Sequence, residues 1–239
     1  MKEIAYSIAD EVFTAFPDYV RGVVVARDVR NGPSPDELVS LLREAEASLR
    51  ENLGTCNPAE HPRIASWREA FRKTGVKPAE FRSSIEAMAR RVAKGQELPS
   101  INALVDIGNV LSLRHLVPTG GHSLDDVTED IALRTAAGDE VFVPFGETEE
   151  EHPFPGEFIF AEGKKVLTRR WSWRQANHTL TLPETRSIEF NVDGLPPVER
   201  SEVEAVCGEL EVLVRRFCGG EFRREILCAS QPRMSLAQF

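Results

Sequence analysis

The centre of the chain contains one unusual stretch, Ser100-Ile101-Asn102-Ala103-Leu104-Val105-Asp106-Ile107-Gly108-Asn109. It places Asn102, Asp106 and Asn109 at intervals of four and three residues, so a helix would carry all three side chains on one face. Asn and Asp compete with a helical backbone for its hydrogen bonds, which is unfavourable inside an otherwise apolar helix. We therefore predict a helix over residues 101–115 whose polar face either hydrogen-bonds neighbouring loops or lines a polar pocket.

Further helices are predicted on the N-terminal side of this stretch. Ser34, Pro35 and Glu37 form a helix start, with an N-cap residue, a proline in the first turn and an acid three residues after the cap. Ser83 and Glu86 form a second capping box. Apolar residues recur at helical spacing after each start and again between the two. The expected helices span 35–53, 64–74 and 84–94, and short strands are expected at 3–8 and 19–29.

The pattern changes to strands from residue 130 onward, where short segments are separated by Gly, Pro or acidic turns. Strands are expected at 131–134, 140–143, 157–160, 166–170, 179–182 and 188–192, followed by a helix at 197–218 and a terminal strand at 222–228. Helices that come mostly first and strands that come mostly second predict an α+β fold, with N-terminal helices packed on a mainly antiparallel β-sheet system. We expect a single domain over residues 1–239.

Length and composition are those of a globular protein with a sizeable core. A chain of 239 residues can bury roughly 70% of its unfolded surface, so it needs no disulfide or metal for stability. The formal net charge of −9 argues against attraction of nucleic acid by the field of the whole molecule. Any contact with nucleic acid would therefore have to be local.

Several classes of protein lack their sequence signals here. The N-terminus has no basic-then-apolar signal-peptide pattern, and the longest apolar run, residues 22–26, is far too short to span a membrane. The four cysteines show neither a C-x-x-C pair nor zinc spacing, which favours reduced thiols in a cytoplasmic protein. Phosphate-loop, dinucleotide, serine-hydrolase and zincin motifs are absent from the sequence. We expect neither a cofactor nor a metal.

Charge is segregated along the chain. Residues 61–94 carry a net charge of +6 and residues 163–178 carry +5, whereas residues 123–157 carry −10. If the two basic tracts share a face, they could follow a phosphate backbone; otherwise their cations only solvate the outer faces of helices. The candidate phosphate contacts are Arg68, Arg72, Lys73, Lys77, Arg82, Arg90, Arg91, Lys164, Lys165 and Arg169.

Two further segments carry residues suited to chemistry. Residues 120–126 are predicted to form a loop with His122 near two carboxylates, and this imidazole could act as a general base, donate to a ligand or simply be solvated. Residues 171–179 contain Trp171 and Trp173 two positions apart, beside Arg, Gln, Asn, His and Thr. Such a cluster suits base stacking or an amino-acid side-chain pocket, although a Trp pair could equally pack the core.

Residues 80–195 resemble the B3/B4 module, the tRNA-binding and editing domain of the bacterial phenylalanyl-tRNA synthetase β subunit. The resemblance rests on the S-I-N-A-x-V-D-x-x-N core at residues 100–109, on Ile131–Ala136 and Gly138–Glu140, and on the Asn177-His178 pair. Residues 75–84 are similar to free-standing members of the same superfamily. No synthetase catalytic core or anticodon-binding part is recognisable in this length, so ligase activity is not expected.

The resemblance implies an editing reaction on tRNA. In the synthetase, the module hydrolyses the ester of wrongly attached tyrosine, and a free-standing copy could do the same in trans on a misacylated aminoacyl-tRNA. The resemblance places His122 at the family's loop histidine, and it places Asn177 at a glutamate that recognises the wrong amino acid, so tyrosine specificity is not carried over. The implied catalytic residues are His122, Asn177 and His178, and the implied substrate-binding residues are Asn102, Trp171, Trp173, Arg174 and Thr179.

Three functions remain open from the sequence. The first is a trans-acting aminoacyl-tRNA deacylase, which the family core and the basic tracts favour. The second is a tRNA-binding module without chemistry, which Asn177 in place of an acid favours, and the third is an amino-acid or small-molecule binding protein, which the net charge favours. Neither DNA nor a membrane is an expected partner.

Overall fold

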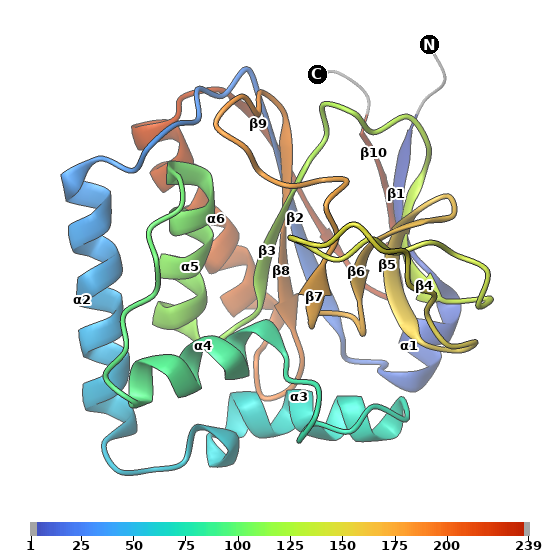
Figure 1. The fold of residues 1–239 in the computed structure, drawn as a ribbon, viewed down its shortest axis with the longest axis horizontal. Helices are drawn as coiled ribbons and strands as arrows, with labels where there is room; N and C mark the ends of the chain where they lie inside the picture. Colours follow the sequence, from blue (N-terminus) through green and yellow to red (C-terminus); the bar gives the residue numbers. More distant parts are fainter. Residues whose placement is uncertain (1–3, 237–239) are drawn as a thin grey trace.

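The structure is a computed structural model in which residues 4–236 are described. Two β-sheets pack face to face, and helices cover the outer face of one of them (Figure 1). The six-stranded sheet has the order β10-β1-β4-β5-β6-β7 and the four-stranded sheet the order β3-β8-β2-β9. The strands of the two sheets are β1 (Ala5–Ile8), β2 (Val20–Arg27), β3 (Thr119–Ser123), β4 (Ile131–Thr135), β5 (Phe158–Glu162), β6 (Lys165–Arg169), β7 (Arg174–Gln175), β8 (Ile188–Gly194), β9 (Glu221–Leu227) and β10 (Arg233–Ser235).

The strand pairing confirms the expected α+β class with mainly antiparallel sheets. Only β1 and β4 pair in parallel among the described strands; the other neighbours within the two sheets are antiparallel. The helices are α1 (Asp10–Ala15), α2 (Asp36–Leu53), α3 (Pro62–Lys73), α4 (Ser84–Ala93), α5 (Ala103–His115) and α6 (Arg200–Phe217), with a 3-10 turn η1 at Pro58–Glu60.

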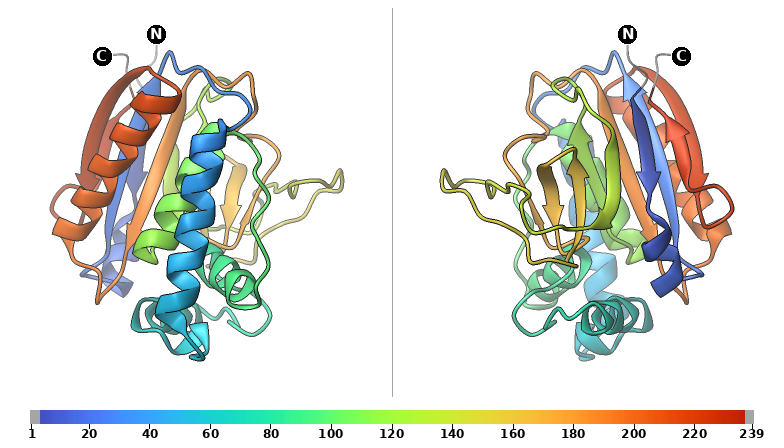
Figure 2. Two further views of the ribbon diagram at one scale, coloured as in Figure 1. Left: turned by 90° about the vertical axis from the view of Figure 1, so that its left-hand side faces the viewer. Right: turned by 90° about the vertical axis from the view of Figure 1, so that its right-hand side faces the viewer.

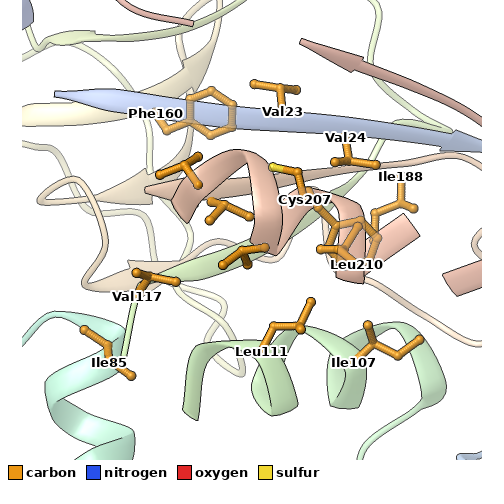
Figure 3. Close-up of a cluster of buried hydrophobic side chains, with 14 of the residues drawn as sticks. Val23, Val24, Ile85, Ile107, Leu111, Val117, Phe160, Ile188, Cys207 and Leu210 are labelled. Atoms are coloured by element: carbon orange, nitrogen blue, oxygen red, sulfur yellow. The ribbon is translucent and has the colours of Figure 1, made fainter. Parts of the chain in front are cut away.

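Helices α5 and α6 pack directly on the four-stranded sheet, and α2 packs on α5 from outside (Figures 1 and 2). Glycine is needed at position 22 of β2, because a β-carbon there would lie 2.2 Å from the Cys207 sulfur of α6. This close approach joins helix and sheet into one apolar core that includes Val24, Leu111 and Leu210 (Figure 3).

The SINALVDIGN stretch folds as the start of α5, and its polar side chains tie the helix to neighbouring loops. Asn102 is the N-cap: its Oδ1 accepts from the Val105 N–H at 3.1 Å and its Nδ2 donates to the Thr181 carbonyl at 2.8 Å. The fully buried Asp106 carboxylate accepts from the hydroxyls of Ser34 (2.6 Å) and Ser100 (2.5 Å). Of the two interpretations of this polar face, the structure shows hydrogen bonding to loops for these two side chains.

Replacing Asn102 by Ala is expected to lower the free energy of unfolding by about 1–2 kcal/mol, because the helix loses its N-cap and the 175–182 segment loses one anchor. Urea titration of the folded chain measures the loss. Asn102→Ser keeps a capping oxygen and removes only the donor to Thr181, so we expect it to cost less than half as much. Equal losses for both variants would contradict the cap assignment.

Three sequence expectations about local structure were wrong. Residues 140–143 form only isolated bridges, from Val141 to Lys165 and from Phe142 to Glu151, instead of a strand. Residues 179–182 are irregular: the Thr179 carbonyl accepts from the Ser123 N–H of β3, and the Thr181 carbonyl accepts from the Asn102 side chain. His122 lies in strand β3 and not in a loop.

Candidate functional site

The face of the four-stranded sheet that looks toward the six-stranded sheet carries a row of buried polar side chains. Along β8 the row consists of Glu189, Asn191 and Asp193, which alternate with the apolar residues that face the helices. Register places Arg21 of β2 opposite Asp193, and His122 of β3 opposite Glu189. Cross-strand partners have β-carbons about 4.5–5.5 Å apart, so these side chains are neighbours on one surface.

Arg21 and Asp193 form the charged centre of this row. The guanidinium donates from Nε to Oδ1 at 2.6 Å and from Nη2 to Oδ2 at 3.1 Å, and both side chains are 1% exposed. Arg21 Nη1 also donates to the Tyr6 hydroxyl at 3.0 Å, and the Tyr19 hydroxyl donates to Asp193. Burial opposes the charge on Arg21, but the Asp193 carboxylate outweighs it and holds the pKa of Arg21 well above its ordinary value.

Glu189 is completely buried, and neither of its carboxyl oxygens makes a well-formed hydrogen bond among residues 4–236, although the Tyr6 hydroxyl lies beside it. Burial raises its pKa to about 8; the positive charge of Arg21 counteracts part of this effect and the negative charge of Asp193 adds to it. The carboxyl group is therefore protonated at neutral pH. An unsatisfied buried acid is costly to a fold, which makes this position a candidate for function.

His122 lies beside Glu189 and is only 3% exposed. Its Nδ1 lies 2.7 Å from Thr179 Oγ1 and its Nε2 lies 3.2 Å from Thr168 Oγ1, while its ring packs against Phe160 at 5.1 Å between centroids. Burial lowers the pKa of His122 to about 3, and the charges of Arg21 and His178 push it in the same direction. The imidazole is therefore neutral at physiological pH, with one nitrogen available as an acceptor.

Residues 175–182, called the strap below, cover His122 and connect several of the residues expected at the site. Gln175 Nε2 donates to the Thr179 carbonyl at 3.2 Å and lies 3.4 Å from His122 Nδ1. The Thr179 carbonyl also accepts from the Ser123 N–H at 3.0 Å. Asn102 holds the far end of the strap through Thr181. His122, Asn102 and Thr179 are thus brought together, as contacts between the strap and the core.

The other implied catalytic residues point elsewhere. His178 Nε2 lies 2.5 Å from Glu162 Oε2. Burial raises the pKa of the Glu162 carboxyl, but the hydrogen bonds that it accepts outweigh burial and hold that pKa below its usual range. The Asn177 amide donates to the Glu147 carbonyl at 2.7 Å and its oxygen accepts from the Gly146 N–H. Arg174 forms an ion pair with the Glu147 carboxylate at 2.6 Å. These three side chains bond to Glu162 and to residues 146–147 and make no hydrogen bond to His122, although His178 lies near enough for its charge to lower the pKa of His122.

The two tryptophans of residues 171–179 do different things. Trp171 is 2% exposed and packs edge-on against Tyr19, Trp67 and Phe16, which makes it a core residue and not part of a substrate pocket. A left-handed backbone at Trp171, with φ of 64°, breaks the strand alternation that would have put both rings on one face. Trp173 instead lies at the surface, in the wall of a groove.

Most cations of the two basic tracts are already engaged by the protein. Buried Glu86 pairs with Arg68 at 2.6 Å and with Arg90 at 2.8 Å. Arg169 was expected to contact phosphate. It is 4% exposed and pairs with Glu157 and Glu151, so it is not available for that contact. Among the other candidate phosphate contacts, Arg72 pairs with Glu69, Lys77 with Glu80 and Lys164 with Asp139. Lys73 donates to the Ala15 carbonyl and lies 4.9 Å over the Phe16 ring, and Arg82 and Arg91 donate to the Ala79 and Glu97 carbonyls. Lys165 is exposed.

Sequence reasoning missed Glu189, Arg21 and Asp193. The segment Ile188–Asp193 alternates apolar and polar residues, which is the ordinary signal of a strand with one solvated face. A second sheet covers that face here, so the alternation has a different meaning. Nothing in the sequence of β8 alone distinguishes the two cases. One sequence feature could have indicated the site. Residues 20–27 have the apolar composition of a buried strand, yet they contain Arg21, and a buried arginine needs a buried acid as its partner.

Within residues 4–236, no group of three or more His, Cys, Asp or Glu side chains is arranged to hold a metal ion. The helices of the described part of the chain are all too short or too polar to cross a membrane. The site is thus a row of acid, base and hydroxyl groups between two sheets of an α+β fold.

This class of fold can be assigned to a family. The B3/4 domain family matches residues 66–217, which is more than half of the chain, and the chain belongs to that family. The structure is also similar to an N-terminal fragment of the phenylalanyl-tRNA synthetase β-subunit from Pyrococcus horikoshii, with a TM-score of 0.47 and 12% sequence identity. That match covers 93% of this chain and 51% of the other, so the chain spans about half the length of the fragment. A comparison with curated proteins gave no match.

The pH dependence of stability follows from the two shifted groups. Glu189 has a pKa of about 8 when folded and about 4.3 when unfolded, so the folded chain holds an extra proton between these values and stability falls as pH rises. His122 has a pKa of about 3 when folded and about 6.5 when unfolded, so its contribution rises with pH over that window. The two slopes cancel between about pH 4.3 and 6.5.

We therefore expect the free energy of unfolding to fall between about pH 6.5 and 8, by up to about 1.4 kcal/mol per pH unit. Denaturant titrations at a series of pH values measure this decline. Glu189→Gln removes the titrating group and should leave stability level over the same range. A decline of the same size in that variant would show that another group causes it.

Proposed function

We propose that this chain hydrolyses the ester bond of a misacylated aminoacyl-tRNA at the His122–Glu189 pair. The observation that carries the proposal is the placement of a neutral imidazole opposite a protonated carboxyl group on one buried sheet face. Membership of the B3/4 domain family and the resemblance of residues 80–195 to a tRNA-binding and editing module support it. A cytoplasmic location goes with this proposal, because charged tRNA is found there.

The two groups have complementary roles in ester hydrolysis. The neutral His122 takes a proton from the attacking water, and the ester carbonyl carbon becomes tetrahedral. Protonated Glu189 donates a hydrogen bond to the oxygen on which negative charge develops, and Arg21 adds a fixed positive charge nearby. Collapse of the intermediate releases the amino acid and returns the proton to the ribose hydroxyl of the tRNA. An aminoacyl ester is already activated, so positioned water and oriented donors are sufficient without a nucleophilic side chain.

Access to this pair requires the strap to move. His122 and Glu189 are 3% and 0% exposed, and the hydrogen bonds from Thr179 and Gln175 close the histidine off from solvent. Opening the strap breaks these contacts and frees the imidazole nitrogen that Thr179 occupies. Movement of such a segment on substrate binding is a common way to exclude bulk water from a reaction.

The test is a deacylation screen over a panel of correctly and wrongly charged tRNAs. We expect the protein to release the amino acid from at least one of them faster than buffer does, and His122→Ala to remove that acceleration. No acceleration with any tRNA would refute hydrolysis.

A tRNA-binding module without chemistry is the second candidate, and two observations favour it. Both nitrogens of His122 already have hydroxyl neighbours, and Asn177, in place of the family's acid, is tied to the 146–147 loop. This candidate predicts measurable affinity for tRNA, weakening steeply with salt, without turnover. Turnover therefore separates the two functions.

A further inference from the structure

A groove of about 540 Å³ lies between α4 and Trp173, on the surface of the molecule. We call it the Trp173 groove. Its walls come from residues that are far apart in sequence, and four of them are basic. The lining residues are Glu80, Arg82, Ala87, Met88, Arg90, Arg91, Lys94, Gln96, Leu98 and Trp173.

Three of the four cations of this groove are free to meet an external anion, whereas Arg90 pairs with Glu86. Arg82, Arg91 and Lys94 are exposed, and none of them has a carboxylate within 4.0 Å in the described part of the chain. Arg91 donates only to the Glu97 carbonyl, at 2.8 Å. Glu80, the single acid of the lining, pairs with Lys77. This is the point at which the first basic tract keeps an unneutralised positive surface.

Trp173 is held rigidly in the wall opposite. Its ring packs edge-on against Phe81, with centroids 4.9 Å apart at 80°, and the Arg170 guanidinium lies 4.3 Å from the ring centroid. Arg170 also lies 3.6 Å over the Phe81 ring, so the cation bridges the two aromatics. The half-exposed indole is therefore a fixed aromatic surface beside a row of cations.

The backbone under Trp173 is strained, and one buried cation beside it is incompletely satisfied. Arg170 and Trp171 both adopt left-handed conformations, with φ of 47° and 64°. Non-glycine residues in this region cost energy, and such strain collects at functional sites. Arg170 is 7% exposed, and its Nη1 has no hydrogen-bond partner among residues 4–236.

We propose that the Trp173 groove binds a single-stranded segment of RNA, with one base stacked on Trp173 and the flanking phosphates on Arg82, Arg91 and Lys94. A cationic groove with an aromatic platform is the arrangement that binds single strands without reading sequence. Duplex RNA fits poorly, because its bases are already stacked and cannot reach the indole. An acidic peptide could use the cations but not the platform.

The inference rests on the proposed function in one respect, namely that the substrate is an RNA. It adds the position of the single-stranded RNA on the surface of the protein. Trp173 precedes Gln175 by two residues, about 7 Å of extended chain, and Gln175 lies against His122. RNA held in the groove therefore passes beside the strap that covers the proposed reactive pair.

The test measures binding of the full chain to a short, fluorescently labelled single-stranded oligoribonucleotide by anisotropy. With three phosphate contacts, affinity should fall about 20-fold between about 50 and 200 mM salt. Trp173→Ala should weaken binding about 5- to 150-fold, and Trp173→Tyr, which keeps an aromatic face, should recover most of it. Arg91→Gln should reduce the slope of log K against log salt by about 0.7.

Arg233→Gln is the matched control, because Arg233 is an exposed cation on β10, at the opposite edge of the six-stranded sheet from β7. It should bind like the wild type. Equal affinity for a duplex of the same sequence or for polyglutamate would overturn the inference, as would unchanged binding in both Trp173→Ala and Arg91→Gln. The Arg91 variant keeps the test valid if Trp173→Ala does not fold.

The same preparations separate this inference from the proposed function. Hydrolysis of charged tRNA with no affinity for the single strand would refute the groove assignment and leave the deacylase proposal standing. Tight, Trp173-dependent binding of the single strand without hydrolysis would support the groove and refute the deacylase proposal.

Discussion

Replacing His122 by Ala is expected to slow ester hydrolysis about 100- to 10,000-fold, which is the usual contribution of a general base. Burial holds the pKa of His122 at about 3 in the closed structure, and opening of the strap returns it toward its ordinary value of about 6.5, so the wild-type rate should fall on the acid side below about pH 6.5. On the alkaline side the rate should decline above about pH 8, where Glu189 loses its proton. Initial rates of amino-acid release across this pH range measure both limits.

Two variants make this prediction specific. Glu189→Gln keeps a hydrogen-bond donor but cannot ionise, so it should retain most of the activity at neutral pH and lose the alkaline decline. His115→Ala is the matched control, because His115 pairs with Glu209 at the surface, at 2.7 Å, and lies outside the site. A decline above pH 8 that persists in Glu189→Gln, or a large loss in His115→Ala, would contradict the assignment.

Replacing Arg21 by Met is expected to lower the free energy of unfolding by about 3–5 kcal/mol. The loss arises because Asp193, 1% exposed, would be left as a buried charge without its partner. The Tyr6 hydroxyl would also lose the hydrogen bond that it accepts from Arg21 at 3.0 Å. Denaturant titration at pH 7 measures the change. Arg200→Met, which removes an exposed pair with Glu204, should cost no more than about 1 kcal/mol.

A double variant decides whether the charge or the packing matters. Arg21→Met combined with Asp193→Asn removes both charges, and it should recover a large part of the stability that the single variant loses. If the double variant is as unstable as the sum of its single variants, the two side chains act independently, and the buried ion pair is not the centre of the cluster.

The parts of the fold that depend on local signals were predictable. The capping box at Ser83 begins α4, and Asn102 begins α5, because capping is decided by a few neighbouring residues. Helix α1 and strand β10 were missed, since six and three residues are too few to give a clear period. The antiparallel sheet system was predicted in kind, whereas its division into two sheets was not.

The candidate site was only partly predictable, because its chemistry depends on what covers a strand face. His122 was identified, but Glu189 lies 67 positions further along the chain and becomes its neighbour only through the β3–β8 register. Burial then gives both groups unusual pKa values, and burial of a polar strand face cannot be inferred from alternation. The roles of Trp171 and Trp173 were likewise decided by a backbone conformation that the sequence does not signal.

Charge segregation proved more informative than total charge, but only after ion pairs were considered. Of the first basic tract, Lys73, Arg82, Arg91 and Lys94 remain without carboxylate partners among the described residues, and the last three line one groove. The second tract divides between buried Arg169 at one end of β6 and Lys165 at the other. The two tracts therefore meet at one place, around Trp173, and do not form a continuous basic face.

The central claim is that the buried His122–Glu189 pair is where an aminoacyl ester is held. The most direct test is an experimental structure of the chain with a non-hydrolysable aminoacyl-adenosine analogue. The account predicts that the strap has moved, and that the acyl carbonyl lies within hydrogen-bond distance of the Glu189 carboxyl and beside the His122 ring. An analogue bound elsewhere on the molecule, with Thr179 still closed over His122, would contradict it.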